Sequence, residues 1–150
     1  MTGLLQGKNI LWVDDHHELT RIERDGLKAA GATLTLADTP SGAFATLKAS
    51  DFDLVILDIM CAGEVPASLM NIKSEIGMKR DGRHNGVPLA IWMLRNKPAL
   101  RFFFYSVVAH SVDEVAGVFD ELEILRRRME EKREISASEF AQLTARYLAT

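Results

Sequence analysis

The 150-residue sequence predicts an α/β protein, a parallel sheet with helices on both of its faces. Short apolar runs alternate along the chain with segments whose apolar residues recur at helical spacing. Two of these runs end in aspartate, and a hydrophobic share of 47% is enough for an ordinary core. Strands alternating with helices imply right-handed crossovers, which pack helices onto both sides of a parallel sheet.

The first half of the chain contains three predicted strands with a helix after each of the first two. Residues 10–13 and 54–57 are continuous apolar runs, typical of parallel strands that are covered on both faces. Residues 33–37 alternate and are β-rich, which predicts another strand. Helical spacing predicts a helix over 18–30, closed by Gly31, and Thr39-Pro40 has the form of an N-cap followed by proline at the first helical position.

The third quarter of the chain begins with a long irregular segment. Residues 59–83 contain glycine, proline, asparagine and scattered charge, which predicts a long loop with a short helix near 67–76. Residues 88–96 predict a helix with proline in its first turn, and the run Phe-Phe-Phe-Tyr-Ser at 102–106 predicts a fourth strand.

The chain after Ser106 favours helix. Apolar residues recur at helical spacing, Ser111 and Glu114 form a capping box, and no Gly, Pro or Asn interrupts 118–134. We therefore expect one long amphipathic helix over about 112–134 in preference to a short helix followed by a fifth strand. Ser136 and Glu139 form a second capping box, which opens a final helix.

Composition excludes several classes of protein. The balance of 18 Lys+Arg against 21 Asp+Glu, a formal net charge of -3, argues against nucleic acid as the main partner. One cysteine excludes an internal disulfide and a cysteine-rich zinc site. The N-terminus has no signal-peptide core, and the apolar runs are too short to span a bilayer. We expect a single domain over 1–150 in the reducing cytoplasm, without a membrane partner.

Polar side chains follow the predicted strands where functional crevices form in parallel sheets, at the carboxyl ends. Asp14-Asp15, Asp58 and Ser106 stand at three such ends. Any one of these aspartates could simply terminate its strand as a turn former, but all of them together favour a site. Gathered carboxylates repel one another, and Mg²⁺, which prefers oxygen ligands, offsets that repulsion. Asp58 could then act as a nucleophile that takes a phosphoryl group.

The motifs that carry these residues resemble those of the receiver domain of two-component response regulators. The resemblance covers roughly the first 110 residues and rests on Val13-Asp14-Asp15, Leu57-Asp58-Ile59-Met60 and Tyr105-Ser106. It implies a flavodoxin-like, doubly wound sheet with strand order 2-1-3-4 and a core over about 8–110. The helical region expected over about 111–150 lies outside the resemblance and is atypical of the family.

The resemblance also implies a role for each site residue. Asp58 is the expected phosphoacceptor and Ser106 the switch hydroxyl that follows the phosphoryl group. Asp15 is the expected direct Mg²⁺ ligand and Asp14 acts mainly through water, while Asp58 and the backbone carbonyl of Met60 complete the metal contacts.

The sequence departs from the receiver pattern after Asp58 and near its end. Met60 is followed by Cys61-Ala62-Gly63 in place of Met-Pro, and the loop that follows is longer than the family needs. The lysine-proline pair that ends the fifth strand of receivers is not evident. Arg126–Arg128 are the nearest candidates, with Arg127 as a substitute for the lysine, although an exposed basic face is the simpler role for them.

These observations predict a stand-alone receiver domain in phosphorelay signalling. A sensor histidine kinase or phosphotransfer protein would donate the phosphoryl group to Asp58 with Mg²⁺ bound, and output would pass through a downstream protein. Such a domain is not an enzyme beyond its own phosphorylation and dephosphorylation.

The missing lysine and strand favour an alternative, a degenerate receiver that acts as a dimerisation or scaffold module. A Mg²⁺-dependent phosphohydrolase is a third reading, but Met60 stands where such enzymes place a second acid.

A homodimer is a further expectation. Without a fifth strand, the apolar strand 102–106 would form an exposed sheet edge, which invites pairing with another chain. The alternative is that the C-terminal helices fold back over their own sheet and leave a monomer.

Overall fold

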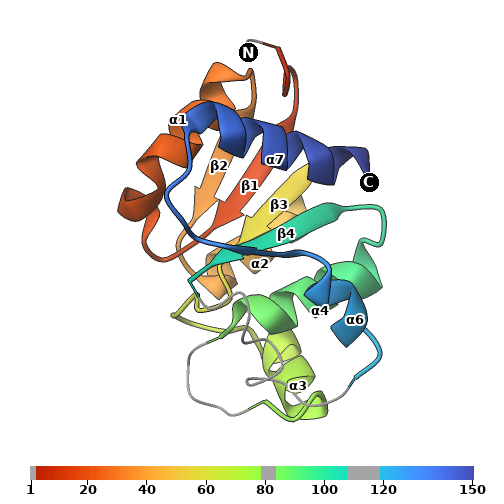
Figure 1. Cartoon of the computed structure of the whole chain (residues 1–150). Helices are drawn as coiled ribbons and strands as arrows, with labels where there is room; N and C mark the ends of the chain where they lie inside the picture. The colour runs from red at the N-terminus through yellow and green to blue at the C-terminus, as the bar shows by residue number, and fades with distance from the viewer. Residues whose placement is uncertain (1–2, 79–83, 108–118) are drawn as a thin grey trace.

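The computed structural model describes residues 3–78, 84–107 and 119–150, and its centre is a sheet of five parallel strands (Figure 1). The spatial order is β2-β1-β3-β4-β5, and every neighbouring pair runs parallel. This order has the reversal of direction expected for a flavodoxin-like sheet. The strands are β1 (Asn9–Val13), β2 (Thr33–Ala37), β3 (Leu54–Leu57), β4 (Arg101–Ser106) and β5 (Met129–Glu131).

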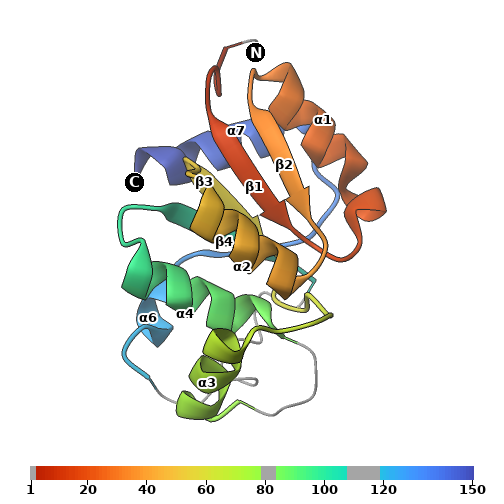
Figure 2. The same ribbon diagram turned by 180° about the vertical axis from the view of Figure 1, so that it is seen from behind.

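Helices cover both faces of the sheet, as the alternating pattern predicts. On one face lie α1 (Arg21–Ala29), which continues from a 3₁₀ turn η1 (His17–Thr20), and α7 (Ala137–Ala149). The opposite face carries α2 (Pro40–Ala49), α4 (Gly86–Asn96) and α6 (Leu122–Arg126), and α3 (Ala67–Glu75) packs against α4 (Figure 2). Within the described ranges, no helix has the length and apolar character needed to cross a membrane.

The core divides into two clusters because successive residues of a strand point to opposite faces of the sheet. In β1, Leu11 and Val13 join the cluster under α2 and α4, whereas Ile10 and Trp12 join the cluster under α1 and α7. The Trp12 ring stacks on Phe140 of α7, with 5.4 Å between the ring centroids. Continuous apolar strands are therefore required here, since both faces are buried.

Local signals place the starts of two helices correctly. The Thr39 hydroxyl accepts a hydrogen bond from the backbone N–H of Gly42 at 3.0 Å, as expected for the N-cap of α2. At α7 the Ser136 hydroxyl accepts from the N–H of Glu139 at 3.1 Å and also contacts that glutamate's carboxylate. The short helix expected near 67–76 is confirmed as α3.

The expectation of one long helix after Ser106 is wrong over residues 119–134. The Ser111–Glu114 capping box lies outside the described residues. Beyond it, the helical spacing of Leu122 and Leu125 belongs to the short helix α6, which a turn at 127–128 separates from β5. Met129 then pairs with Phe104 in parallel register. A fifth strand is therefore present, β4 is not a sheet edge, and the basis for expecting edge-to-edge pairing is removed.

Candidate functional site

The carboxyl ends of four strands bring the candidate residues together on one rim of the sheet. Asp14 follows β1, Asp58 follows β3, Ser106 ends β4, and Lys132 follows β5. Asp14 and Ser106 are fully buried, and Asp58 is only 5% exposed. The sequence predicts three of these four residues, and the parallel topology explains why they converge.

Three carboxylates form the acidic part of the site. Asp14, Asp15 and Asp58 each offer an oxygen, and these oxygens lie within 4.8 Å of one another. The backbone N–H of His16 donates to Asp14 Oδ1 at 2.9 Å and thereby fixes the turn after β1. An all-oxygen donor set of this kind fits a hard divalent cation such as Mg²⁺, and Met60 lines the cavity that contains Asp15 and Asp58.

Both carboxylate oxygens of Asp58 have partners. The Ser106 hydroxyl donates to Asp58 Oδ1 at 2.6 Å, and the backbone N–H of Met60 donates to the same oxygen at 3.1 Å. Lys132 Nζ donates to Asp58 Oδ2 at 3.3 Å and to Asp14 Oδ2 at 2.7 Å. The ammonium group therefore bridges the first and third strands and offsets part of the negative charge.

Lys132 is the residue of this site that the sequence prediction missed. Burial acts to lower its pKa, but the hydrogen bond to Asp14 and the charges of Asp14 and Asp58 outweigh burial, so its pKa is raised and the side chain remains an ammonium ion. Arg133 follows it where proline was expected. A signal was available, because Lys132 is the only lysine after Lys97 and stands just before the capping box of the last helix.

The arginines considered as substitutes lie elsewhere. Arg127 precedes β5, at the amino end of that strand, which is the end of the sheet opposite Asp58. Its side chain is 75% exposed, with Nε 3.9 Å from Glu123. The Arg128 guanidinium lies over the Phe102 ring at 4.5 Å from the centroid. The assignment of Arg127 to the lysine role is therefore wrong.

An open cavity of about 380 Å³ leads from the surface to the carboxylates. Its polar lining comes from Asp15, Asp58 and Lys132, and its apolar lining includes the exposed side chains of Leu19 and Val107. The site can therefore admit a small anion or the reactive group of a partner protein.

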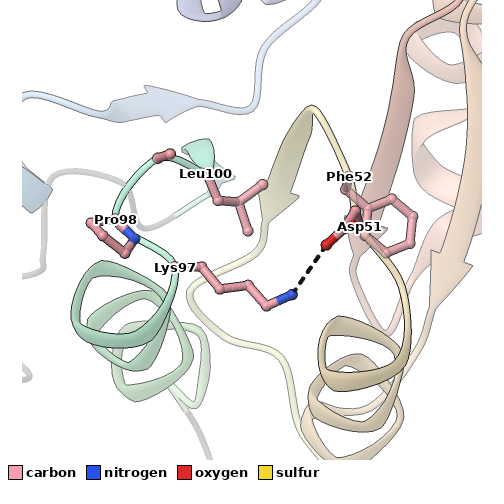
Figure 3. Close-up of a pocket in the computed structure, with 6 residues that line it drawn as sticks. Asp51, Phe52, Lys97, Pro98 and Leu100 are labelled. Carbon is pink, nitrogen blue, oxygen red and sulfur yellow. Dashed lines mark ion pairs between the residues drawn. The ribbon is translucent and has the colours of Figure 1, made fainter.

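A second hollow lies at the opposite end of the sheet, beside the amino ends of β3 and β4 (Figure 3). It is lined by Phe52, Pro98 and Leu100, and Lys97 Nζ lies 3.8 Å from Asp51 Oδ1 across it. The hollow holds one exposed ion pair and is separated by the length of the strands from Asp58, so it does not contribute to the acidic site.

The fold has counterparts among solved structures. The non-phosphorylated HemR receiver domain from Leptospira biflexa is similar with a TM-score of 0.60 at 22% identity, over 95% of both chains. The response regulator TrrA from Thermotoga maritima, solved with Mg²⁺ and BeF, has a TM-score of 0.51 at 20% identity, over 80% of this chain and 95% of that chain. NtrX from Brucella abortus has a TM-score of 0.64 at 18% identity, over 95% of this chain but 27% of NtrX.

These likenesses show that the chain has the fold of response regulator receiver domains, as the sequence resemblance implies. The predicted flavodoxin-like class is confirmed, with the fifth strand added to the predicted order. At the level of sequence, no protein-family model and no curated protein matches the chain.

Proposed function

We propose that this protein is a receiver domain that accepts a phosphoryl group on Asp58. One observation carries the proposal: the Asp58 carboxylate is contacted on one oxygen by the Ser106 hydroxyl and on the other by Lys132. Asp14 and Asp15 lie beside it as further oxygen donors. A nucleophile, a hydroxyl, a cation and an acidic pair are the parts that aspartyl phosphate formation requires.

The donor in this proposal is a phosphohistidine on a sensor kinase or phosphotransfer protein. An oxygen of Asp58 attacks phosphorus, an O–P bond forms, the N–P bond breaks, and the imidazole leaves with its electron pair and takes up a proton. Lys132 and Ser106, which contact Asp58 in this structure, are placed to donate to oxygens of the incoming group. Mg²⁺, held by Asp14, Asp15, Asp58 and the Met60 carbonyl, would supply charge compensation when bound.

The output follows from the charge that the site gains. A phosphoryl group adds about -1.5 to -2 charges at neutral pH, next to Lys132 and Ser106. Both residues would shift their contacts from the carboxylate to the phosphoryl oxygens, and β4 and β5 would transmit that change to the neighbouring helices. We infer a downstream protein as the target and the cytoplasm as the setting.

The scaffold alternative depended on the absence of a lysine and of a fifth strand. Lys132 and β5 remove both of these reasons. The phosphohydrolase reading is disfavoured because Met60 occupies the place where such enzymes commonly have a second acid. A homodimer through the region after Ser106 stays a prediction, and sedimentation at high protein concentration tests it.

The test is phosphorylation with a small donor. The protein is incubated with Mg²⁺ and acetyl phosphate and its intact mass is measured, beside Asp58→Asn as the control that keeps the shape of the side chain. We expect one added phosphoryl group in the parent only, and a thermal shift with beryllofluoride that the control lacks. The proposal would be overturned if neither the added mass nor the thermal shift depended on Asp58. Steady phosphate release from phosphoesters would favour the hydrolase.

A further inference from the structure

The loop after Asp58 is held in place from the start of α4. The backbone N–H of Gly86 donates to the Ile59 carbonyl at 3.1 Å, and the Asn85 side-chain amide donates to the Cys61 carbonyl at 3.0 Å. Met60 lies between these two anchored carbonyls. The peptide groups on both sides of the expected metal-binding carbonyl are thus fixed by residues that come from a different part of the chain.

The Asn85 amide is in turn fixed by a buried lysine. Lys73 of α3 is fully buried, and its Nζ donates to Asn85 Oδ1 at 2.8 Å. A lysine can only donate and the Cys61 carbonyl can only accept, so one orientation of the Asn85 amide satisfies both. Because burying an ammonium group is costly unless it is hydrogen-bonded, the contact with Asn85 offsets part of the cost of burying Lys73.

The start of α4 also lies in close contact with the residue proposed as phosphoacceptor, Asp58. A Cβ atom at Gly86 would lie within 2.2 Å of the Asp58 carbonyl oxygen, so the start of α4 packs directly on the backbone of Asp58. A displacement of residues 85–86 would therefore move the loop, since packed interiors transmit small shifts.

We propose that Lys73 and Asn85 are positioning residues that hold loop 59–62 in the geometry the Asp58 site needs. For its reaction this inference rests on the proposed function, whereas the anchoring of the loop can be measured without it. The contacts that define this role join Lys73 to Asn85 and Asn85 to the Cys61 carbonyl. Their effect passes through the Cys61 carbonyl to the neighbouring Met60 carbonyl and to Asp58.

The only cysteine of the chain supplies a direct reporter of this loop. Cys61 is 1% exposed, so its thiol is shielded from reagents in solution. A buried thiol reacts only when the loop opens. The rate of Cys61 modification by a disulfide reagent therefore measures loop opening in the folded protein, without metal or phosphoryl donor.

The experiment compares Asn85→Ala and Lys73→Met with Leu143→Ala. Leu143 is buried in α7 on the other face of the sheet, so this control lowers global stability without touching the loop. We expect Cys61 modification to accelerate about three- to tenfold in the two variants, the fold-change that lost hydrogen bonds give, and not in the control. Mg²⁺ affinity and the rate of acetyl phosphate labelling should each fall about tenfold.

The outcomes separate this inference from the proposed function. The inference would be overturned if Cys61 were modified in the two variants at the same rate as in the parent, or at the rate found in Leu143→Ala. It would also be overturned if Cys61 modification accelerated while Mg²⁺ affinity and the rate of labelling stayed unchanged. If the parent binds Mg²⁺ but is never labelled, while the variants lose Mg²⁺ affinity, the proposed function fails and the positioning role stands. A parent that neither binds Mg²⁺ nor is labelled would overturn both.

Discussion

Replacement of Lys132 by methionine should make the stability of the protein depend on Mg²⁺. Lys132 Nζ lies 2.7 Å from Asp14 Oδ2 and 3.3 Å from Asp58 Oδ2, and Asp14 is fully buried. Methionine keeps most of the apolar stem of lysine but removes the charge. The variant therefore leaves two neighbouring carboxylates without the cation that lies between them.

The magnitude follows from distance and burial. At an effective dielectric constant of about 20, charges at these distances attract by about 5 to 6 kcal/mol each, before the cost of desolvating the ammonium is subtracted. Removing one partner of a buried ion pair typically costs about 3–5 kcal/mol. Because 15% of the Lys132 side chain is exposed and water can enter the cavity, we expect a net loss of about 2–3 kcal/mol.

Mg²⁺ should recover part of that loss. The ammonium group occupies the same carboxylate oxygens that a cation would use, so its removal should tighten Mg²⁺ binding by about tenfold, which is about 1.4 kcal/mol. Phosphoryl transfer should nevertheless slow, because the donor to the phosphoryl oxygens is lost.

The assay is urea unfolding followed by circular dichroism, in EDTA and in saturating Mg²⁺, with Arg127→Met as the matched control. Arg127 is exposed and distant from the carboxylates, so its replacement should change stability by less than about 0.5 kcal/mol in both buffers. The reasoning is refuted if Lys132→Met and Arg127→Met are equally stable in EDTA. It is also refuted if Mg²⁺ does not reduce the difference in the free energy of unfolding between Lys132→Met and the parent.

Three further predictions concern the surroundings of the site. Ser106→Ala should cost about 1.5–3 kcal/mol in urea unfolding, since a buried hydrogen bond to the charged Asp58 is lost, and should slow but not abolish labelling. Gly86→Ala should cost about 1–3 kcal/mol and reduce labelling, because the new methyl group meets the Asp58 carbonyl; unchanged stability would contradict this contact. Burial, followed by hydrogen bonds to glutamates, raises the pKa of Tyr105 and Tyr147. The free energy of unfolding should therefore be fully retained below about pH 10 and fall above it by up to about 1.4 kcal/mol per pH unit for each tyrosine, a slope that Tyr105→Phe and Tyr147→Phe each reduce.

The parts of the fold that could be predicted are those with a strong local pattern. The strands around Trp12 and Ile56 are buried on both faces, so their sequence is continuously apolar and their ends are marked by aspartate. Thr39-Pro40 and the Ser136–Glu139 capping box correctly placed the starts of α2 and α7. Topology then brought Asp14, Asp58 and Ser106 to one rim without any need for side-chain detail.

The fifth strand and its lysine could not be predicted in this way, for a physical reason. β5 has three residues, Met-Glu-Glu, at the edge of the sheet, and none of them is fully buried. An edge strand of that kind leaves no apolar run, whereas Leu122 and Leu125 beside it leave a clear helical signal. The Lys73–Asn85 hydrogen bond could not be predicted from the sequence for a different reason. A single buried charged or amide side chain produces no periodic pattern in the sequence.

The pairing of the first and last parts of the site has a consequence for biogenesis. Asp14 and Lys132 contact each other although 118 positions separate them in the chain. This contact can form only after residue 132 has been synthesised, so the acidic residues exist for most of synthesis without their cation. A chain clipped before residue 132 would therefore retain Asp14, Asp15 and Asp58 yet lack the ammonium group that pairs with them.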